Sequence, residues 1–105
     1  MLDLTAGTKK FLPIKLPSGV TVNVLMPKKK LMDAMMDMEE DLKTKNTPMD
    51  LIDRIVEMVS RILSNNVSGT EITPSEVEDQ LDFSDMAAVF RAYQDFALEA
   101  VNDPN

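Results

Sequence analysis

Apolar residues recur with a helical period over most of the chain after residue 29, and this period is clearest between residues 48 and 64. At ~100° per residue, the apolar side chains of that segment cover a continuous arc of ~160°. They are Leu51, Ile52, Ile55, Val56, Met58, Val59, Ile62 and Leu63. The opposite, polar side is predicted to carry Asp53, Arg54, Glu57, Ser60 and Arg61. Thr47 is a suitable N-cap and Pro48 suits the first helical position, so we predict a helix over 48–64.

Three further segments have helical patterns. Residues 29–43 place five apolar side chains on one face, namely Leu31, Ala34, Met35, Met38 and Leu42. The run Thr73-Pro74-Ser75-Glu76 has the form of a capping box and predicts a short helix over 74–81. A last helix begins after Asp82 or Ser84 and runs over about 84–102. Its broad apolar face is made of Met86, Val89, Phe90, Tyr93, Phe96, Ala97, Ala100 and Val101. These patterns predict three helices in addition to 48–64.

The N-terminal part of the chain has the shorter period of a strand. Val20, Val22 and Val24 alternate with polar residues, and Pro17-Ser18-Gly19 separates them from an earlier apolar run. We predict a β-hairpin that pairs 9–16 with 20–26. Pro13 has no N–H group, so its strand should lie at an edge or contain a bulge. Two strands alone are marginally stable, so the hairpin should pack on the helices.

The predicted fold class is therefore α+β, with an N-terminal β-hairpin followed by a bundle of three to four α-helices. A chain of 105 residues fits one domain. We predict that this domain covers 9–102, after a flexible N-terminus (1–8) and before a tail (103–105).

The composition argues against enzyme chemistry. The chain has no cysteine and no histidine, so it lacks thiols, disulfides and the commonest general base and metal ligand. Its three glycines form no phosphate-binding loop motif. Carboxylates cluster at 37–41 and 76–79, but on polar arcs of predicted helices and without calcium-loop spacing. We predict no catalytic residue, no metal site, no cofactor and no enzymatic activity.

The charge is unevenly distributed along the chain. Residues 1–30 contain six lysines and one aspartate, whereas residues 31–105 contain five basic and seventeen acidic residues. An acidic body repels phosphate backbones, so we predict no nucleic-acid binding. No apolar run approaches the ~20 residues that span a bilayer, and no signal segment precedes the hairpin, so we expect a cytoplasmic protein with no membrane contact. The unequal charges suit docking on a partner of matching pattern, and a homo-oligomer is left open.

Seven residues are candidates for partner binding. Met32 and Met36 lie on an apolar shoulder outside the main stripe of helix 29–43, and Ala87 and Leu98 lie on a similar shoulder of helix 84–102. Exposed apolar patches of this kind mark interfaces, and methionine adapts to varied apolar shapes. The alternative is that the hairpin covers these shoulders. The basic run Lys28-Lys29-Lys30 is either solvated or an electrostatic docking site for an acidic partner.

The layout also resembles a known family. A short hairpin (FLPIKLPSG, 11–19) comes first, an ITPSEVEDQLD segment follows at 72–82, and the chain closes on AVFRAYQDFALEA at 88–100. This arrangement is similar to the tail assembly chaperones of long-tailed bacteriophages and prophages of Gram-positive bacteria. The resemblance implies a protein of the host bacterial cytoplasm that binds and solubilises the tape-measure protein during tail morphogenesis. Tail tube protein is a second implied partner, recruited in some members by a longer frameshifted form.

A different class of function stays open beside this one. The acidic body would also suit a regulator, or a nucleic-acid mimic, that occupies the binding groove of a basic partner. Salt separates the two hypotheses, because binding through charge weakens steeply as salt rises and binding through apolar helices changes little.

Overall fold

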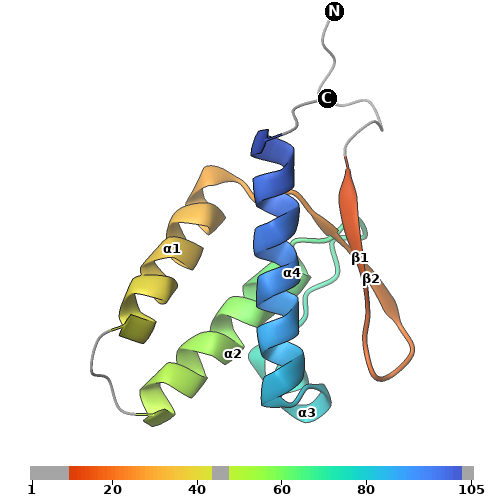
Figure 1. Cartoon of the computed structure of the whole chain (residues 1–105). Helices are drawn as coiled ribbons and strands as arrows, with labels where there is room; N and C mark the ends of the chain where they lie inside the picture. Colours follow the sequence, from red (N-terminus) through yellow and green to blue (C-terminus); the bar gives the residue numbers. More distant parts are fainter. Residues whose placement is uncertain (1–9, 44–47, 103–105) are drawn as a thin grey trace, which may run out of the picture.

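The computed structural model describes residues 10–43 and 48–102, and it confirms the predicted α+β fold class. The elements are β1 (Phe11–Lys15), β2 (Thr21–Leu25), α1 (Lys29–Lys43), α2 (Pro48–Ser64), α3 (Pro74–Gln80) and α4 (Phe83–Asn102). An antiparallel hairpin thus precedes four helices (Figure 1). The predicted flexible N-terminus (1–8) and the predicted tail (103–105) lie outside the described residues, as does the predicted cap Thr47.

The hairpin strand that contains Pro13 is an edge strand without a bulge. Its five residues pair one to one with β2, from Phe11 opposite Leu25 to Lys15 opposite Thr21. On its other side, β2 bonds to the segment after α2: Leu25 N–H donates to the Asn65 carbonyl over 2.7 Å. Because the N–H of Leu25 points away from β1, Leu25 and its partner Phe11 form a pair without mutual backbone hydrogen bonds. Such pairs alternate with hydrogen-bonded pairs, so the pair of Pro13 and Asn23, two residues along, is of the same kind, and the Pro13 nitrogen lies on the open edge. The open edge therefore lacks a central donor, which disfavours pairing with a further strand.

The turn of the hairpin depends on a left-handed residue. Gly19 N–H donates to the Leu16 carbonyl and Leu16 N–H to the Val20 carbonyl, both over 2.8 Å. Gly19 has a φ of +95°. Glycine adopts positive φ readily, whereas a residue with a Cβ atom would be strained in this conformation. The Pro17-Ser18-Gly19 signal in the sequence was therefore sufficient to predict this reversal.

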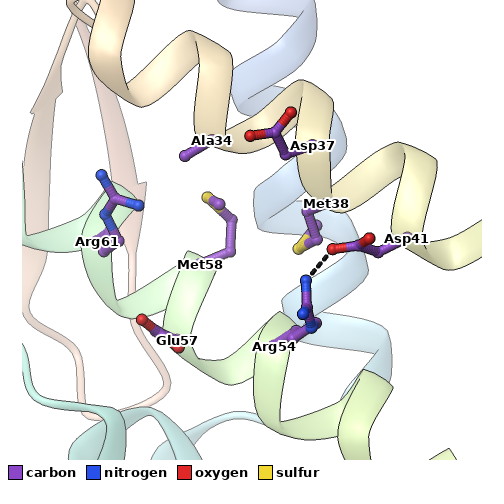
Figure 2. A pocket seen from close by; sticks show the side chains of 8 residues that line it. All are labelled: Ala34, Asp37, Met38, Asp41, Arg54, Glu57, Met58 and Arg61. Atoms are coloured by element: carbon purple, nitrogen blue, oxygen red, sulfur yellow. Dashed lines mark hydrogen bonds and ion pairs between the residues drawn. The ribbon is translucent and has the colours of Figure 1, made fainter. Parts of the chain in front are cut away.

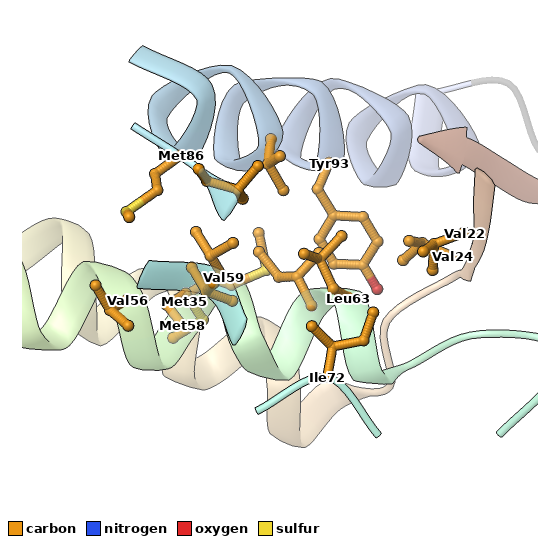
Figure 3. Close-up of a cluster of buried hydrophobic side chains, with 14 of the residues drawn as sticks. Val22, Val24, Met35, Val56, Met58, Val59, Leu63, Ile72, Met86 and Tyr93 are labelled. Atoms are coloured by element: carbon orange, nitrogen blue, oxygen red, sulfur yellow. The ribbon is translucent and has the colours of Figure 1, made fainter. Parts of the chain in front are cut away.

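The helix α2 is the centre of the fold. It packs against α1, α3, α4 and β2, and its predicted apolar arc supplies much of the core (Figure 3). Val59 and Ile62 are fully buried. The prediction was wrong for Ser60, which is buried and not on the solvent side. Its hydroxyl donates to the Ile72 carbonyl over 2.6 Å, because the segment before α3 folds back over α2.

The helix ends follow local capping chemistry. Thr73 Oγ1 accepts a hydrogen bond from Glu76 N–H at the start of α3, as predicted. The fourth helix begins at Phe83, directly after Asp82, which is the earlier of the two predicted starts. Asp85 N–H donates to Asp82 Oδ1 over 2.8 Å, and Asp82 N–H donates back to Asp85 Oδ2 over 3.1 Å. This reciprocal pair makes Asp82 the N-cap and Phe83 the first helical residue.

A buried tyrosine ties three distant segments together. The Tyr93 hydroxyl donates to the Leu25 carbonyl over 2.6 Å and accepts from Asn65 Nδ2 over 3.2 Å. Asn65 Nδ2 also lies 3.3 Å from the same Leu25 carbonyl. The closing helix, the end of α2 and the hairpin therefore share one polar junction inside an apolar core.

This junction gives a pH-dependent prediction. Burial raises the pKa of Tyr93 from 10.0 to about 12, and the hydrogen bond from Asn65 offsets only part of the rise. The unfolded chain ionises this phenol with a pKa near 10.0, whereas the folded protein keeps it protonated up to about 12. The free energy of unfolding therefore does not change through Tyr93 below pH 10.0, and it falls as the pH rises from 10.0 toward 12. The chain has one tyrosine and no tryptophan, so near-ultraviolet phenolate absorbance reports Tyr93 alone. We expect a midpoint near 12 in the folded protein and near 10.0 in concentrated urea; equal midpoints would contradict the buried junction.

Candidate functional site

The apolar shoulders predicted on two helices lie on the sides of α1 and α4 that are joined by a hydrogen bond. Gln94 of α4 donates from Nε2 to Glu39 Oε1 of α1 over 2.5 Å, so these residues mark the facing sides of the two helices. On α1, Met32 lies seven residues before Glu39 and Met36 lies three residues before it. On α4, Ala87 lies seven residues before Gln94 and Leu98 lies four residues after it. These spacings return to nearly the same side of a helix. The four predicted residues therefore lie on the sides of α1 and α4 that meet at this hydrogen bond. A single feature opens there, and of the four predicted residues only Ala87 lines it.

That feature is a cavity of about 220 Å³, which we name the α1–α4 groove. It is lined by Met38, Ile55, Phe83, Met86, Ala87, Phe90, Arg91 and Gln94. Met38 and Met86 are buried and form its floor, with Ile55 and Phe90 half-buried beside them. Phe83, Ala87 and Arg91 are exposed at its lip. The two helices run in opposite directions along it (Figure 1). The groove is thus apolar at its base and open to solvent along its length.

Large apolar side chains are exposed around this groove. Met36 is 62% exposed, Leu98 53% and Phe83 51%, although each has a large apolar surface that favours burial. Met32 differs from the other shoulder residues, because it is half-buried and packs against the core. The part of the predicted patch that stays in water is therefore Met36, Ala87 and Leu98, extended by Phe83.

The hairpin does not cover these residues. It packs on another side of α4, where β1 and the helix enclose a separate cavity of about 300 Å³. Asp85, Ala88 and Ala92 of α4 line that second cavity. Because Ala88 follows Ala87 by ~100° around the helix, the two alanines face different cavities. The alternative in which the hairpin shields the shoulders is therefore wrong.

Phe83 was not among the predicted contact residues. Its position follows from the reciprocal cap between Asp82 and Asp85, which makes Phe83 the first residue of α4 and places it at the lip of the groove. The signal was present in the sequence as Asp82-Phe83-Ser84-Asp85, an acidic variant of the capping box.

A third cavity, which is charged, lies between α1 and α2 (Figure 2). Arg54 and Asp41 form an ion pair across it, and Asp37, Glu57 and Arg61 line the remainder. Acidic and basic side chains alternate here on the outer sides of two helices, so much of this surface is a solvated charge network. Among the residues that the structure describes, no group of three or more aspartates and glutamates could hold a metal ion.

The structure separates the three predicted lysines. Lys29 forms an ion pair with Asp33, one turn later in α1, over 2.8 Å. The hydrogen bond to the Asp33 carboxylate, together with its charge, raises the pKa of Lys29. Lys28 and Lys30 instead line a cavity of about 360 Å³ together with Arg61 of α2. The lysine run is therefore not a single surface.

The class that these observations define is a small α+β protein with an open apolar groove between two helices. Comparison of the chain with protein-family models, with curated proteins and with solved structures finds no match. The resemblance to tail assembly chaperones therefore stays a prediction. No helix within the described parts of the chain has the length and apolar character needed to cross a bilayer.

Proposed function

We propose that this protein is a non-enzymatic chaperone that binds an amphipathic helix of another protein in the α1–α4 groove. The observation that carries the proposal is the gathering of exposed apolar side chains on the facing sides of α1 and α4. Phe83 is 51% exposed at the lip of the apolar cavity, and Met36 and Leu98 are 62% and 53% exposed, each one helical turn from the contact between Glu39 and Gln94. Helix-in-groove recognition uses this arrangement, with apolar anchors of the guest helix placed between two host helices.

The chemistry of the groove suits guests of varied sequence. Met38 and Met86 form its floor, and the exposed Met36 lies three residues before Glu39 on α1. Methionine side chains are unbranched and polarisable, so they adjust to apolar side chains of different shape. A guest helix would pack on the methionine floor and cover Phe83 and Phe90. Such a groove favours tolerant and reversible binding over recognition of one fixed sequence.

The resemblance of the sequence to tail assembly chaperones suggests which guest this is. The tape-measure protein is long and largely helical, so it presents repeated apolar stripes before the tail tube forms around it. Copies of this protein along such a rod would bind weakly and at many points. Tail tube subunits could then displace them without an energy source. The site of action would be the bacterial cytoplasm.

Co-expression with a tape-measure protein tests the proposal. We expect the partner to be more soluble with this chain than without it. We expect the variant Leu98→Asp to lose this effect and to weaken binding at least about tenfold, because a carboxylate would be buried against the apolar guest. Val67→Asp is the matched control: Val67 is also exposed, at 58%, but lies in the loop after α2. Equal solubility with and without this chain, or equal losses in the two variants, would count against a groove-binding chaperone.

The salt dependence of the same interaction tests the alternative. A regulator that mimics nucleic acid would bind a basic partner through the acidic side chains, and its affinity would fall steeply with salt. Binding in the α1–α4 groove should change little over the same range. A steep loss that Leu98→Asp leaves unchanged would favour the acidic regulator.

A further inference from the structure

The basic cavity at the start of α1 is lined by three cations, none of which forms an ion pair within the described residues. Lys28 and Lys30 come from the start of the helix, and Arg61 comes from the last turn of α2. Within the described residues, the ion pairs are Lys29 with Asp33 and Arg54 with Asp41, and neither involves these three cations. What distinguishes this cavity is that three cations line it together, and no acidic residue is among the residues that line it.

The position of the two lysines opposes the stability of α1. The first turn of a helix carries a partial positive charge, which favours acidic side chains and disfavours lysine. The first turn of α1 contains no acidic residue. Lys29 is neutralised by Asp33, but Lys28 and Lys30 add charge to an end that is already positive. A feature that costs local stability and is not offset within the fold is typical of a binding surface.

The neutral polar groups of the cavity are already used within the protein. Ser64 Oγ accepts from Ile72 N–H over 2.9 Å and is 3.0 Å from the Ile72 carbonyl, to which it donates. Asn65 Nδ2 points to Tyr93 and to the carbonyl of Leu25. A ligand of this cavity would therefore be recognised by its charge and not by directed hydrogen bonds from neutral groups. That favours a flexible acidic segment over a small anion that needs a defined set of donors.

We propose that the cavity formed by Lys28, Lys30 and Arg61 binds a carboxylate-rich segment of a partner protein. A protein segment fits better than nucleic acid, because residues 31–105 carry seventeen acidic and five basic residues and would repel a long phosphate backbone. A short acidic segment would contact the basic cavity without following the acidic surface. This site is separate from the α1–α4 groove and does not depend on it.

The test measures binding of a labelled peptide of glutamate and serine, with a glutamine and serine peptide as the uncharged comparison. Fluorescence anisotropy of the full chain at low salt should detect the glutamate peptide and should show affinity falling as salt rises. The double variant Lys28→Gln/Lys30→Gln should weaken binding about tenfold. The matched control is Lys15→Gln/Lys29→Gln, which removes the same charge from exposed lysines outside the cavity and should weaken binding less than about twofold.

Thermal unfolding of the same variants provides an independent readout. Lys28→Gln/Lys30→Gln should raise the melting temperature, because it removes unpaired charge from the positive end of α1. The control should not raise it, because it breaks the pair between Lys29 and Asp33. Higher stability together with weaker binding would distinguish a binding site from a structural one.

Several results would overturn this proposal. One is the absence of glutamate-peptide binding at low salt, and another is equal weakening by the two double variants. Stronger binding of a short oligonucleotide or of inorganic phosphate than of the peptide would assign the cavity to phosphate. Concentration-dependent self-association that disappears in Lys28→Gln/Lys30→Gln would assign it to a second copy of this chain.

Discussion

Replacing Asn66 with aspartate should destabilise the protein by about 2–4 kcal/mol, although the two side chains have nearly the same shape. Asn66 is 6% exposed and uses its whole amide group. Its Nδ2 donates to the carbonyls of Leu63 and Thr70 over 2.8 and 2.7 Å. Its Oδ1 accepts from Thr70 N–H over 3.0 Å and from the Ser68 hydroxyl over 2.9 Å. A carboxylate would keep the two acceptor contacts but would place a charged oxygen against two carbonyl oxygens.

Chemical denaturation followed by circular dichroism measures this effect. Ser68→Ala is the matched control, because it removes one of the four hydrogen bonds and leaves the two donors of Asn66 in place. We expect it to cost less than about 1 kcal/mol. A free energy of unfolding for Asn66→Asp within about 0.5 kcal/mol of the wild type would contradict the buried amide. Because Asn66 is buried in this way, the Asn66-Val67-Ser68 sequon is not an accessible glycosylation site.

Replacing Ile62 with alanine should cost about 2–5 kcal/mol. Ile62 is fully buried in α2, where core residues from the other elements surround it. Truncation would remove apolar contacts and leave a cavity that a helix packed on several sides cannot collapse to fill. The total stability of a domain of this size is about 5–15 kcal/mol, so this one change would remove a large share of it.

Ile52→Ala is the matched comparison for this experiment. Ile52 lies on the same helix but is only half-buried, so the same truncation should cost clearly less. Urea denaturation of both variants, followed by helical circular dichroism, gives the two free energies. Equal costs at the two positions would mean that α2 is not the centre of the core.

The elements of this fold were predictable from the sequence because their boundaries depend on nearby residues. Gly19 sets the hairpin turn, and Thr73 caps α3 through a contact three residues away. Ser60 was misplaced because its partner, Ile72, belongs to a loop that folds back over α2. Helical periodicity cannot report such a tertiary contact, and it therefore assigned a small polar residue to the solvent side.

The candidate site was predictable only in part, for the same reason. The sequence indicated Met36, Ala87 and Leu98 as exposed apolar residues on two helices. That these residues lie on the sides of α1 and α4 that meet depends on the contact between Glu39 and Gln94, which are 55 residues apart in the chain. Of the three, only Ala87 lines the groove. The lysine run shows a similar limit. The pairing of Lys29 with Asp33 is local, but Arg61 approaches Lys28 and Lys30 only because α1 packs against α2.

The buried junction at Tyr93 has a consequence for the order of events during translation. The hairpin is synthesised first, yet its carbonyl at Leu25 receives the Tyr93 hydroxyl only after α4 has left the ribosome. The same helix supplies one wall of the α1–α4 groove. A nascent chain that lacks α4 therefore has an incomplete core and no place to hold a guest. Binding competence should arise late and all at once, so that unfinished chains do not compete with finished ones.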